Sequence, residues 1–199
     1  MIRVTGAVYT KTYTAPPINR REIFRYLGAR DDVPEVSALV DECIAEAQGA
    51  LSYKVCFCEV DVLREGNALI LGTVKTSSSA LGKNLSGCER AVIFAATVGV
   101  SLDRLIARYS AGAPSKAVVL DAIGAERIEA LCDEFSTDIS SECETRPRFS
   151  PGYGDFALEA QRDIFALLDC PRKIGLALNE SLLMSPSKSV TAIIGKVRI

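Results

Sequence analysis

The residues best suited to hold a ligand lie in one short stretch, residues 146–156, which reads RPRFSPGYGDF. Its two arginines carry planar guanidinium groups, and Arg148 in particular could bind a carboxylate or a phosphate through paired hydrogen bonds. The two prolines fix φ, while Gly152 and Gly154 allow a ligand to approach the main chain closely. We expect a rigid, extended turn with exposed carbonyl and N–H groups. The alternative, which the residue types alone favour, is a plain Pro/Gly connection with solvated arginines.

A row of acidic residues offers a second candidate. Glu126, Glu129 and Asp133 follow one another at i, i+3 and i+7 within a predicted helix, so they should share one face. Two interpretations remain open for this row. It is either a solvated helix surface or a negative wall that faces a cationic ligand.

The sequence contains no histidine, which excludes histidine-dependent triads and histidine metal sites. Any chemistry must therefore rest on carboxylates, lysine, tyrosine, cysteine or a bound cofactor. The odd number of cysteines, seven, favours reduced thiols that act as small buried apolar residues. We assign no catalytic residue and no metal site to this chain. The cysteines are Cys43, Cys56, Cys58, Cys88, Cys132, Cys143 and Cys170.

The elements that must position these residues follow from the hydrophobic pattern. The helices expected are 19–28 with Asn19 as its cap, 32–48 with Asp32 as its cap, 77–85, 101–112 capped by Ser101, 115–140 capped by Ser115, and 157–168. The strands expected are 2–10, a hairpin of 53–62 with 68–71, a buried central strand over 91–96, a short strand over 174–178, and a last strand from 190 to 199. Strands and helices do not alternate strictly. The pattern therefore favours an α+β fold with a mostly antiparallel, twisted sheet and helices.

Length and composition suit one globular domain spanning residues 1–199, with 48% hydrophobic and 24% charged residues. No apolar run reaches the roughly 18 residues that a membrane span needs. The N-terminus does not resemble a signal peptide, so we expect a cytoplasmic protein without a membrane partner. The net charge of −2 and the lack of a basic block argue against nucleic acid as a partner.

Two motifs resemble those of a known family. Residues 148–153, Arg-Phe-Ser-Pro-Gly-Tyr, are similar to the R-x-x-P-G-Y signature of the activation domain of cobalamin-dependent methionine synthase. Residues 178–190, LNESLLMSPSKSV, are similar to the L-T-E-S-x-x-M-x-P-x-x-S-V run of the same family. The two motifs come in the family's order and at about its spacing. The close resemblance covers about residues 115–195, whereas the N-terminal part, about 1–112, matches in general layout only. The family's architecture is the α+β fold favoured above.

The resemblance implies a binding site for S-adenosylmethionine. Arg148 matches the arginine that binds the ligand's α-carboxylate. Ser150, Gly152 and Tyr153 match the positions whose main chain lines the adenosine pocket. Glu129 matches an acidic residue on the long helix that faces the ligand.

The sequence also departs from the family's pattern. The residues after Tyr153 are Gly154, Asp155 and Phe156 rather than a cysteine-containing run, and Asn179 replaces a threonine. The resemblance implies no ligand contact for the opening residues of the second motif, Glu180 and Ser181, which are expected to form a cap or turn.

The implied function is repair of an oxidised cobalamin. The chain would be an accessory subunit that brings S-adenosylmethionine to the cobalamin of a separate methionine synthase lacking its own activation domain. An electron donor such as flavodoxin would reduce the cobalt before the methyl transfer. Two alternatives remain. The chain could be a docking module that has itself lost the ligand and serves another corrinoid protein, or it could be an independent S-adenosylmethionine-dependent enzyme.

Overall fold

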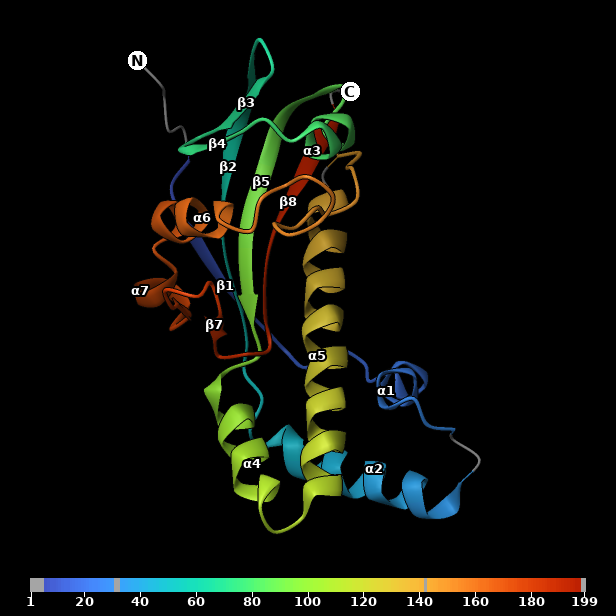
Figure 1. The fold of residues 1–199 in the computed structure, drawn as a ribbon. Coiled ribbons are helices and arrows are strands. Elements are labelled where there is room, and N and C mark those ends of the chain that lie inside the picture. Colours follow the sequence, from blue (N-terminus) through green and yellow to red (C-terminus); the bar gives the residue numbers. More distant parts are fainter. Residues whose placement is uncertain (1–5, 31–32, 142, 198–199) are drawn as a thin grey trace.

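The computed structural model describes residues 6–30, 33–141 and 143–197, and its centre is a twisted sheet in which all strand pairs are antiparallel (Figure 1). Within these residues the strand order is β4-β3-β2-β5-β8, and β1 pairs with the first half of β2. The strands are β1 Tyr9–Tyr13, β2 Tyr53–Glu65, β3 Ala68–Leu71, β4 Val74–Thr76, β5 Cys88–Thr97 and β8 Ser189–Val197. A separate pair joins β6 Ala177–Leu178 to β7 Met184–Ser185. The predicted α+β class is confirmed.

The central position of β5 follows from its composition. Residues 91–97 of this strand are all buried, and β5 pairs with β2 on one side and β8 on the other. A continuous apolar run is what a strand covered on both faces requires. The predicted buried central strand and the predicted hairpin of β2 with β3 are both confirmed.

Helices cover both faces of the sheet, and each face carries its own apolar cluster (Figure 1). The long helix α5 lies on one face, and α6 and α7 lie on the other. Residues of β8 alternate between the two clusters, since Ala192 and Ile194 join the α5 cluster whereas Ile193 joins the α6 cluster. The helices are α1 Arg20–Leu27, α2 Pro34–Gln48, α3 Ser79–Asn84, α4 Val100–Ser110, α5 Pro114–Ser140, α6 Ala160–Leu168 and α7 Cys170–Ile174.

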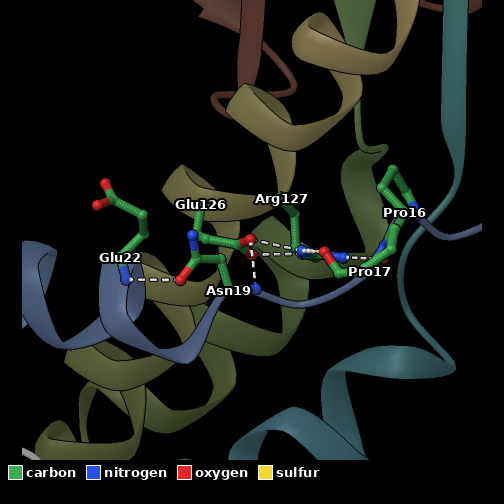
Figure 2. Close-up of polar contacts among 6 residues, drawn as sticks. All are labelled: Pro16, Pro17, Asn19, Glu22, Glu126 and Arg127. Carbon is green, nitrogen blue, oxygen red and sulfur yellow. Dashed lines mark hydrogen bonds and ion pairs between the residues drawn. The ribbon is translucent and has the colours of Figure 1, made fainter.

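A buried ion pair fastens the N-terminal segment to α5 (Figure 2). Arg127 is 1% exposed and donates to the carboxylate of Glu126 and to the carbonyl oxygens of Pro16 and Pro17. Glu126 in turn accepts a hydrogen bond of 3.0 Å from the backbone N–H of Asn19. The paired charges and the proline carbonyls satisfy one another, which is the condition for burying them.

Several predicted helix starts need correction. Asn19 caps α1 as expected, accepting from the backbone N–H of Glu22 at 3.3 Å. Ser101 and Ser115 do not cap α4 and α5; the cap positions are Gly99, with φ of 90°, and Ala113, which precedes a proline in the first turn. Proline at the first position already fixes the φ that a helix needs, so α5 begins there without a side-chain cap. The expected cap Asp32 lies outside the described residues.

The first strand also lies later than predicted. β1 spans Tyr9–Tyr13 instead of 2–10, and residues 1–5 are not described. Before it, Gly6 passes close to the main chain of β2, where an added Cβ would lie 2.4 Å from the carbonyl oxygen of Glu59. The short elements β4 and α7 were not predicted, because runs this short leave little periodicity.

The cysteines behave as packing residues. All seven are free thiols, and six are buried while Cys143 is half-buried. Burial raises the pKa of Cys58 to about 11 and that of Cys132 to about 12, which keeps both thiols protonated near neutral pH.

Candidate functional site

The candidate site is a cavity of about 360 Å³ beside the edge strand β8. The loop of residues 146–156, called here the ligand loop, forms one wall, and β7 and β8 form another. Helices α5 and α6, which lie on opposite faces of the sheet, each contribute one side chain to the lining. The volume falls within the range of small-molecule sites.

The ligand loop is tied to the free edge of β8 by backbone hydrogen bonds. Phe149 and Ile193 exchange N–H···O bonds of 2.9 Å in both directions, and Arg146 donates to the carbonyl of Gly195 at 2.8 Å. The start of the loop therefore continues the sheet for a few residues. This pairing fixes the position of Arg148, which lies between the two bonded residues.

Helix α3 holds the loop at both of its ends. Asn84 donates to the carbonyl of Pro147 at 3.1 Å. At the other end, Asp155 accepts from the hydroxyl of Ser78 at 2.5 Å and from the backbone N–H groups of Ser79 and Ala80. The Ser78 hydroxyl and these N–H groups lower the pKa of Asp155 to about 2.

Two glycines shape the turn between these anchors. Gly152 and Gly154 have φ of 91° and 57°, a region that side chains disfavour. An added Cβ at Gly154 would lie 3.0 Å from the Cβ of Ala80. The Gly-Asp-Phe run that departs from the family pattern thus serves to dock the loop on α3, and Phe156 is buried beneath it.

Arg148 faces two carboxylates of α5. Its Nη2 lies 2.6 Å from Oε2 of Glu129, and its Nη1 lies 2.5 Å from Oδ1 of Asp133. Burial opposes the charge of the guanidinium, but the hydrogen bond to Asp133 and the charges of the acidic neighbours raise the pKa of Arg148 above its ordinary value. The three side chains are 26%, 44% and 70% exposed, so the cluster lies at the surface.

The predicted acidic row is divided by the fold. Glu129 and Asp133 meet Arg148, and Glu129 also lines the cavity. Glu126 instead enters the buried pair with Arg127 (Figure 2). The row is therefore not one solvated face: Glu126 is buried, whereas Glu129 and Asp133 lie at the surface and are paired with a cation.

The structure brings together most of the predicted site residues. Arg148, Ser150, Tyr153 and Glu129 all line the same cavity, and Tyr153 is 68% exposed. Gly152 shapes the turn, but it is not among the residues that line the cavity. That these residues contact S-adenosylmethionine stays a prediction.

One expectation about the loop is wrong. Its N–H groups were expected to be exposed, but at least five of them, those of Arg146, Phe149, Gly152, Tyr153 and Phe156, are already bonded within the chain. Phe149 donates to Ile193, Gly152 donates to the carbonyl of Phe156 at 2.7 Å, and Tyr153 donates to that of Ser150 at 3.3 Å. The rigidity of the turn comes from these bonds as well as from the prolines.

The second motif lines the same cavity as the first. Met184, Ser189 and Val190 contribute to the wall opposite the loop. The hydroxyl of Ser189 lies 2.8 Å from both the hydroxyl oxygen of Thr97 and the carbonyl of Pro186, which explains a serine at this position. Glu180 is exposed and does not line the cavity.

The turn before β8 is held by the helices of the α5 face. Asp103 of α4 accepts from both the N–H and the hydroxyl of Ser187, at 2.8 and 2.6 Å. Lys188 pairs with Asp121 of α5 at 2.7 Å. These contacts fix the place where the second motif enters β8.

Two polar residues of the cavity were missed by sequence reasoning. Gln161 of α6 is 6% exposed and Thr191 of β8 is 2% exposed, and both line the cavity. Gln161 precedes Ile164, Phe165 and Leu168 by three, four and seven residues, so it lies on the buried stripe of α6. Gln161 could have been identified from the sequence, because a polar residue on the otherwise apolar stripe of a predicted helix is unusual.

Two searches of the described residues gave negative results. Within residues 6–30, 33–141 and 143–197, no group of three or more His, Cys, Asp or Glu side chains could hold a metal ion. In the same part of the chain, every helix is too short or too polar to span a bilayer.

No family model matches the chain, and no curated protein matches its sequence. Among solved structures, it is similar to the MetH reactivation domain bound to AdoHcy. That likeness has a TM-score of 0.72 at 16% sequence identity, and it covers 98% of this chain and 80% of the other. It therefore extends over the N-terminal half, where the sequence motifs are absent. The chain has the fold of the methionine synthase reactivation domain.

Proposed function

We propose that the cavity binds S-adenosylmethionine and that the chain serves as the activation subunit of a separate cobalamin-dependent methionine synthase. The observation that carries this proposal is the convergence of the two motifs. Residues from 148–153 and from 184–190, two segments separated by 30 residues of sequence, line one cavity with Arg148 and Glu129 side by side.

The charges of the cavity suit the amino-acid end of this ligand. Arg148 can donate two hydrogen bonds to the α-carboxylate, and Glu129 can accept from the α-ammonium group. Two carboxylates, Glu129 and Asp133, face one guanidinium, so the cluster has a surplus of one negative charge. S-adenosylmethionine carries two positive charges and one negative charge, and its net charge of +1 balances that surplus.

The role of the chain in this proposal is to bind and present the ligand. The ligand's sulfonium supplies the methyl group, and the cobalamin that receives it belongs to the partner chain. The cavity lies at the surface, with Tyr153 largely exposed at its wall, so a bound ligand remains accessible to a partner. Positioning of this kind needs no proton shuttle on the chain, which agrees with a sequence that has no histidine.

The partner of the proposal is a methionine synthase that lacks its own activation domain, in the cytoplasm. Docking should be transient, because the same cobalamin must also meet its other substrates. A small interface, near or below about 1,200 Å², is the expected class.

A reactivation assay tests the proposed function. Such a synthase, inactivated with its cobalamin oxidised, is mixed with S-adenosylmethionine, a reductant such as reduced flavodoxin, and this chain. Recovery of methylcobalamin should require the chain and should fail with Arg148→Ala. Arg172→Ala, at an 81% exposed arginine outside the cavity, is the matched control and should support full recovery. Equal recovery without the chain would refute the activation role.

A further inference from the structure

We propose that Arg146 is a positioning residue, which aims Arg148 at the carboxylates of α5 by holding the start of the ligand loop in one register against β8. This inference rests on the proposed function, because Arg148 is the residue assigned there to the ligand's α-carboxylate. Arg146 lies outside both sequence motifs, and it does not line the cavity. Its role must therefore come from what it contacts.

The first observation is a change of register between the ligand loop and β8. Arg146 donates its backbone N–H to the carbonyl of Gly195, whereas Phe149 exchanges both backbone bonds with Ile193. Between these two pairs the loop has two residues, 147–148, but β8 has only one. Two residues that face one across an antiparallel pair form a β-bulge, a feature that redirects the side chains beside it.

The bulge turns the two arginines of the loop to opposite faces of the sheet. Residues two apart in a regular strand face the same side, so Arg146 and Arg148 would share a face if the pairing were regular. Arg148 reaches Glu129 and Asp133 on the α5 face. The stem of Arg146 lies on the other face, where its Cγ is 3.4 Å from the position of a Cβ added at Gly195. That added Cβ would also meet two side chains of the α6 cluster.

Helix α3 holds Arg146 on this second face. Nη2 of Arg146 donates to the carbonyl of Ser86, just beyond the helix, at 3.2 Å. Two positions earlier, Asn84 donates to the carbonyl of Pro147, the next residue of the loop. Nε of Arg146 is buried and has no hydrogen-bond partner, so the bond to Ser86 and packing hold the guanidinium. The end of α3 thus grips the loop immediately before Arg148.

Only the bulged register satisfies both arginines. A slip of one residue moves a side chain to the other face of a sheet. If the register of Arg146 continued without the bulge, Arg148 would lie opposite Ile193 and face away from the carboxylates of α5. If the register of Phe149 applied throughout, Arg146 would lie opposite Lys196, a like charge, and would lose its contact beyond α3. The bond of Arg146 therefore favours the one pairing that aims Arg148 at the cavity.

Calorimetric titration with S-adenosylmethionine tests the inference through Arg146→Met, which keeps a long side chain but removes the donor. Binding should weaken by about 3- to 10-fold, the loss expected for one hydrogen bond. Loss of a positive charge alone would act in the opposite direction, because the ligand is a net cation. Arg172→Met, at an 81% exposed arginine, is the charge control and should bind at least as tightly as the wild type. Arg146→Lys keeps a charged donor and should recover most of the affinity.

A double variant separates positioning from a direct or a merely structural role. If Arg146 acts through Arg148, Arg146→Met should cause a further loss of less than about twofold when Arg148→Ala is already present. The same fold-loss in both backgrounds would overturn the inference. It would make Arg146 either a ligand contact or a residue that supports the fold without aiming Arg148.

Hydrogen exchange of the ligand-free chain gives a readout that does not depend on binding. The amides of Phe149 and Ile193 bond each other's carbonyls, so Arg146→Met should speed their exchange by about 3- to 10-fold and leave the amides of β5 unchanged. Arg146→Gln is the second variant if Arg146→Met does not fold. Unchanged exchange of these two amides would overturn the inference even if affinity falls. If the wild type does not bind S-adenosylmethionine but the two amides exchange faster in Arg146→Met, the proposed function fails and the hold of Arg146 on the register stands.

Discussion

Nη2 of Arg148 and Oε2 of Glu129 lie 2.6 Å apart and join the ligand loop to the long helix α5. The two residues are 19 positions apart in sequence, and both line the cavity. Without a ligand, the guanidinium is therefore already held by carboxylates, Glu129 on one side and Asp133 on the other. A ligand carboxylate must exchange with one of these partners, and the two acidic residues should then differ in their effect on binding.

Glu129→Gln and Asp133→Asn form a matched pair that tests this difference. Glu129 lines the cavity and is assigned to the ligand's ammonium group, so Glu129→Gln should weaken S-adenosylmethionine by roughly fivefold, as expected of a partly exposed charge pair. Asp133 lies outside the lining and competes for Arg148, so Asp133→Asn should bind equally well or more tightly. Calorimetry at low ionic strength measures both. Equal losses in the two variants would contradict the assignment of Glu129.

The anchoring of the loop by Asp155 predicts a dependence on pH. Its pKa is lowered from an ordinary 3.8 to about 2, so the charged form contributes stability that is present above about pH 4 and lost as the pH falls toward 2. Asp155→Asn should therefore be less stable than the wild type at pH 6, and the difference should shrink at pH 2.5. Urea unfolding midpoints at the two pH values measure it.

The control for Asp155 is Glu180→Gln, which changes an exposed carboxyl outside the cavity. It should match the wild type at pH 6. A constant difference between Asp155→Asn and the wild type at both pH values would show that the carboxylate charge does not hold the loop.

Gly154→Ala and Gly28→Ala compare two glycines of similar conformation. Both have positive φ, 57° and 62°, so each alanine should cost about 1 kcal/mol in backbone strain. Only at Gly154 does the new Cβ meet another atom, the Cβ of Ala80 at 3.0 Å. Gly154→Ala should therefore lose more stability and also weaken ligand binding, whereas Gly28→Ala should bind normally. If Gly154→Ala binds the ligand as well as the wild type does, the docking of the loop on α3 is not needed for ligand binding.

The buried Glu126–Arg127 pair predicts a large effect far from the cavity. Arg127→Met would leave the carboxylate of Glu126 without its paired charge and two proline carbonyls without their donor, at a cost of about 3 kcal/mol or more (Figure 2). The double variant Glu126→Gln/Arg127→Met removes the unpaired charge and should recover part of that loss. Chemical denaturation of the two variants measures it. A double variant no more stable than Arg127→Met would show that the charge is not the cause.

Much of the fold could be predicted from local patterns. The apolar run of β5, the hairpin of β2 with β3 and the cap of α1 each depend on a few adjacent residues, and each was placed correctly. The caps of α4 and α5 were placed incorrectly. These helices begin at a glycine with positive φ and at a proline, and not at a serine whose side chain bonds the first turn. Local rules fail where a different backbone solution is equally good.

The site was only partly predictable for a different reason. Arg148 and the second motif could be found by resemblance, but their convergence on one cavity depends on the pairing of Phe149 with Ile193. The acidic row could not be divided in advance, since whether Glu126 or Glu129 is buried depends on the segment that crosses α5 at Pro16 and Pro17. Gln161 and Thr191 carry no motif, and only the structure shows their unsatisfied atoms.

The most direct test is calorimetric titration of the purified chain with S-adenosylmethionine, comparing the wild type with Arg148→Ala and Arg172→Ala. The wild type and Arg172→Ala should bind equally. Arg148→Ala should bind about 10- to 150-fold more weakly, the loss expected for a hydrogen-bonded charge. Its thermal midpoint without ligand should be nearly unchanged, because the ion pairs of Arg148 are partly exposed. Equal affinity of the wild type and Arg148→Ala, or no binding by the wild type, would contradict the account.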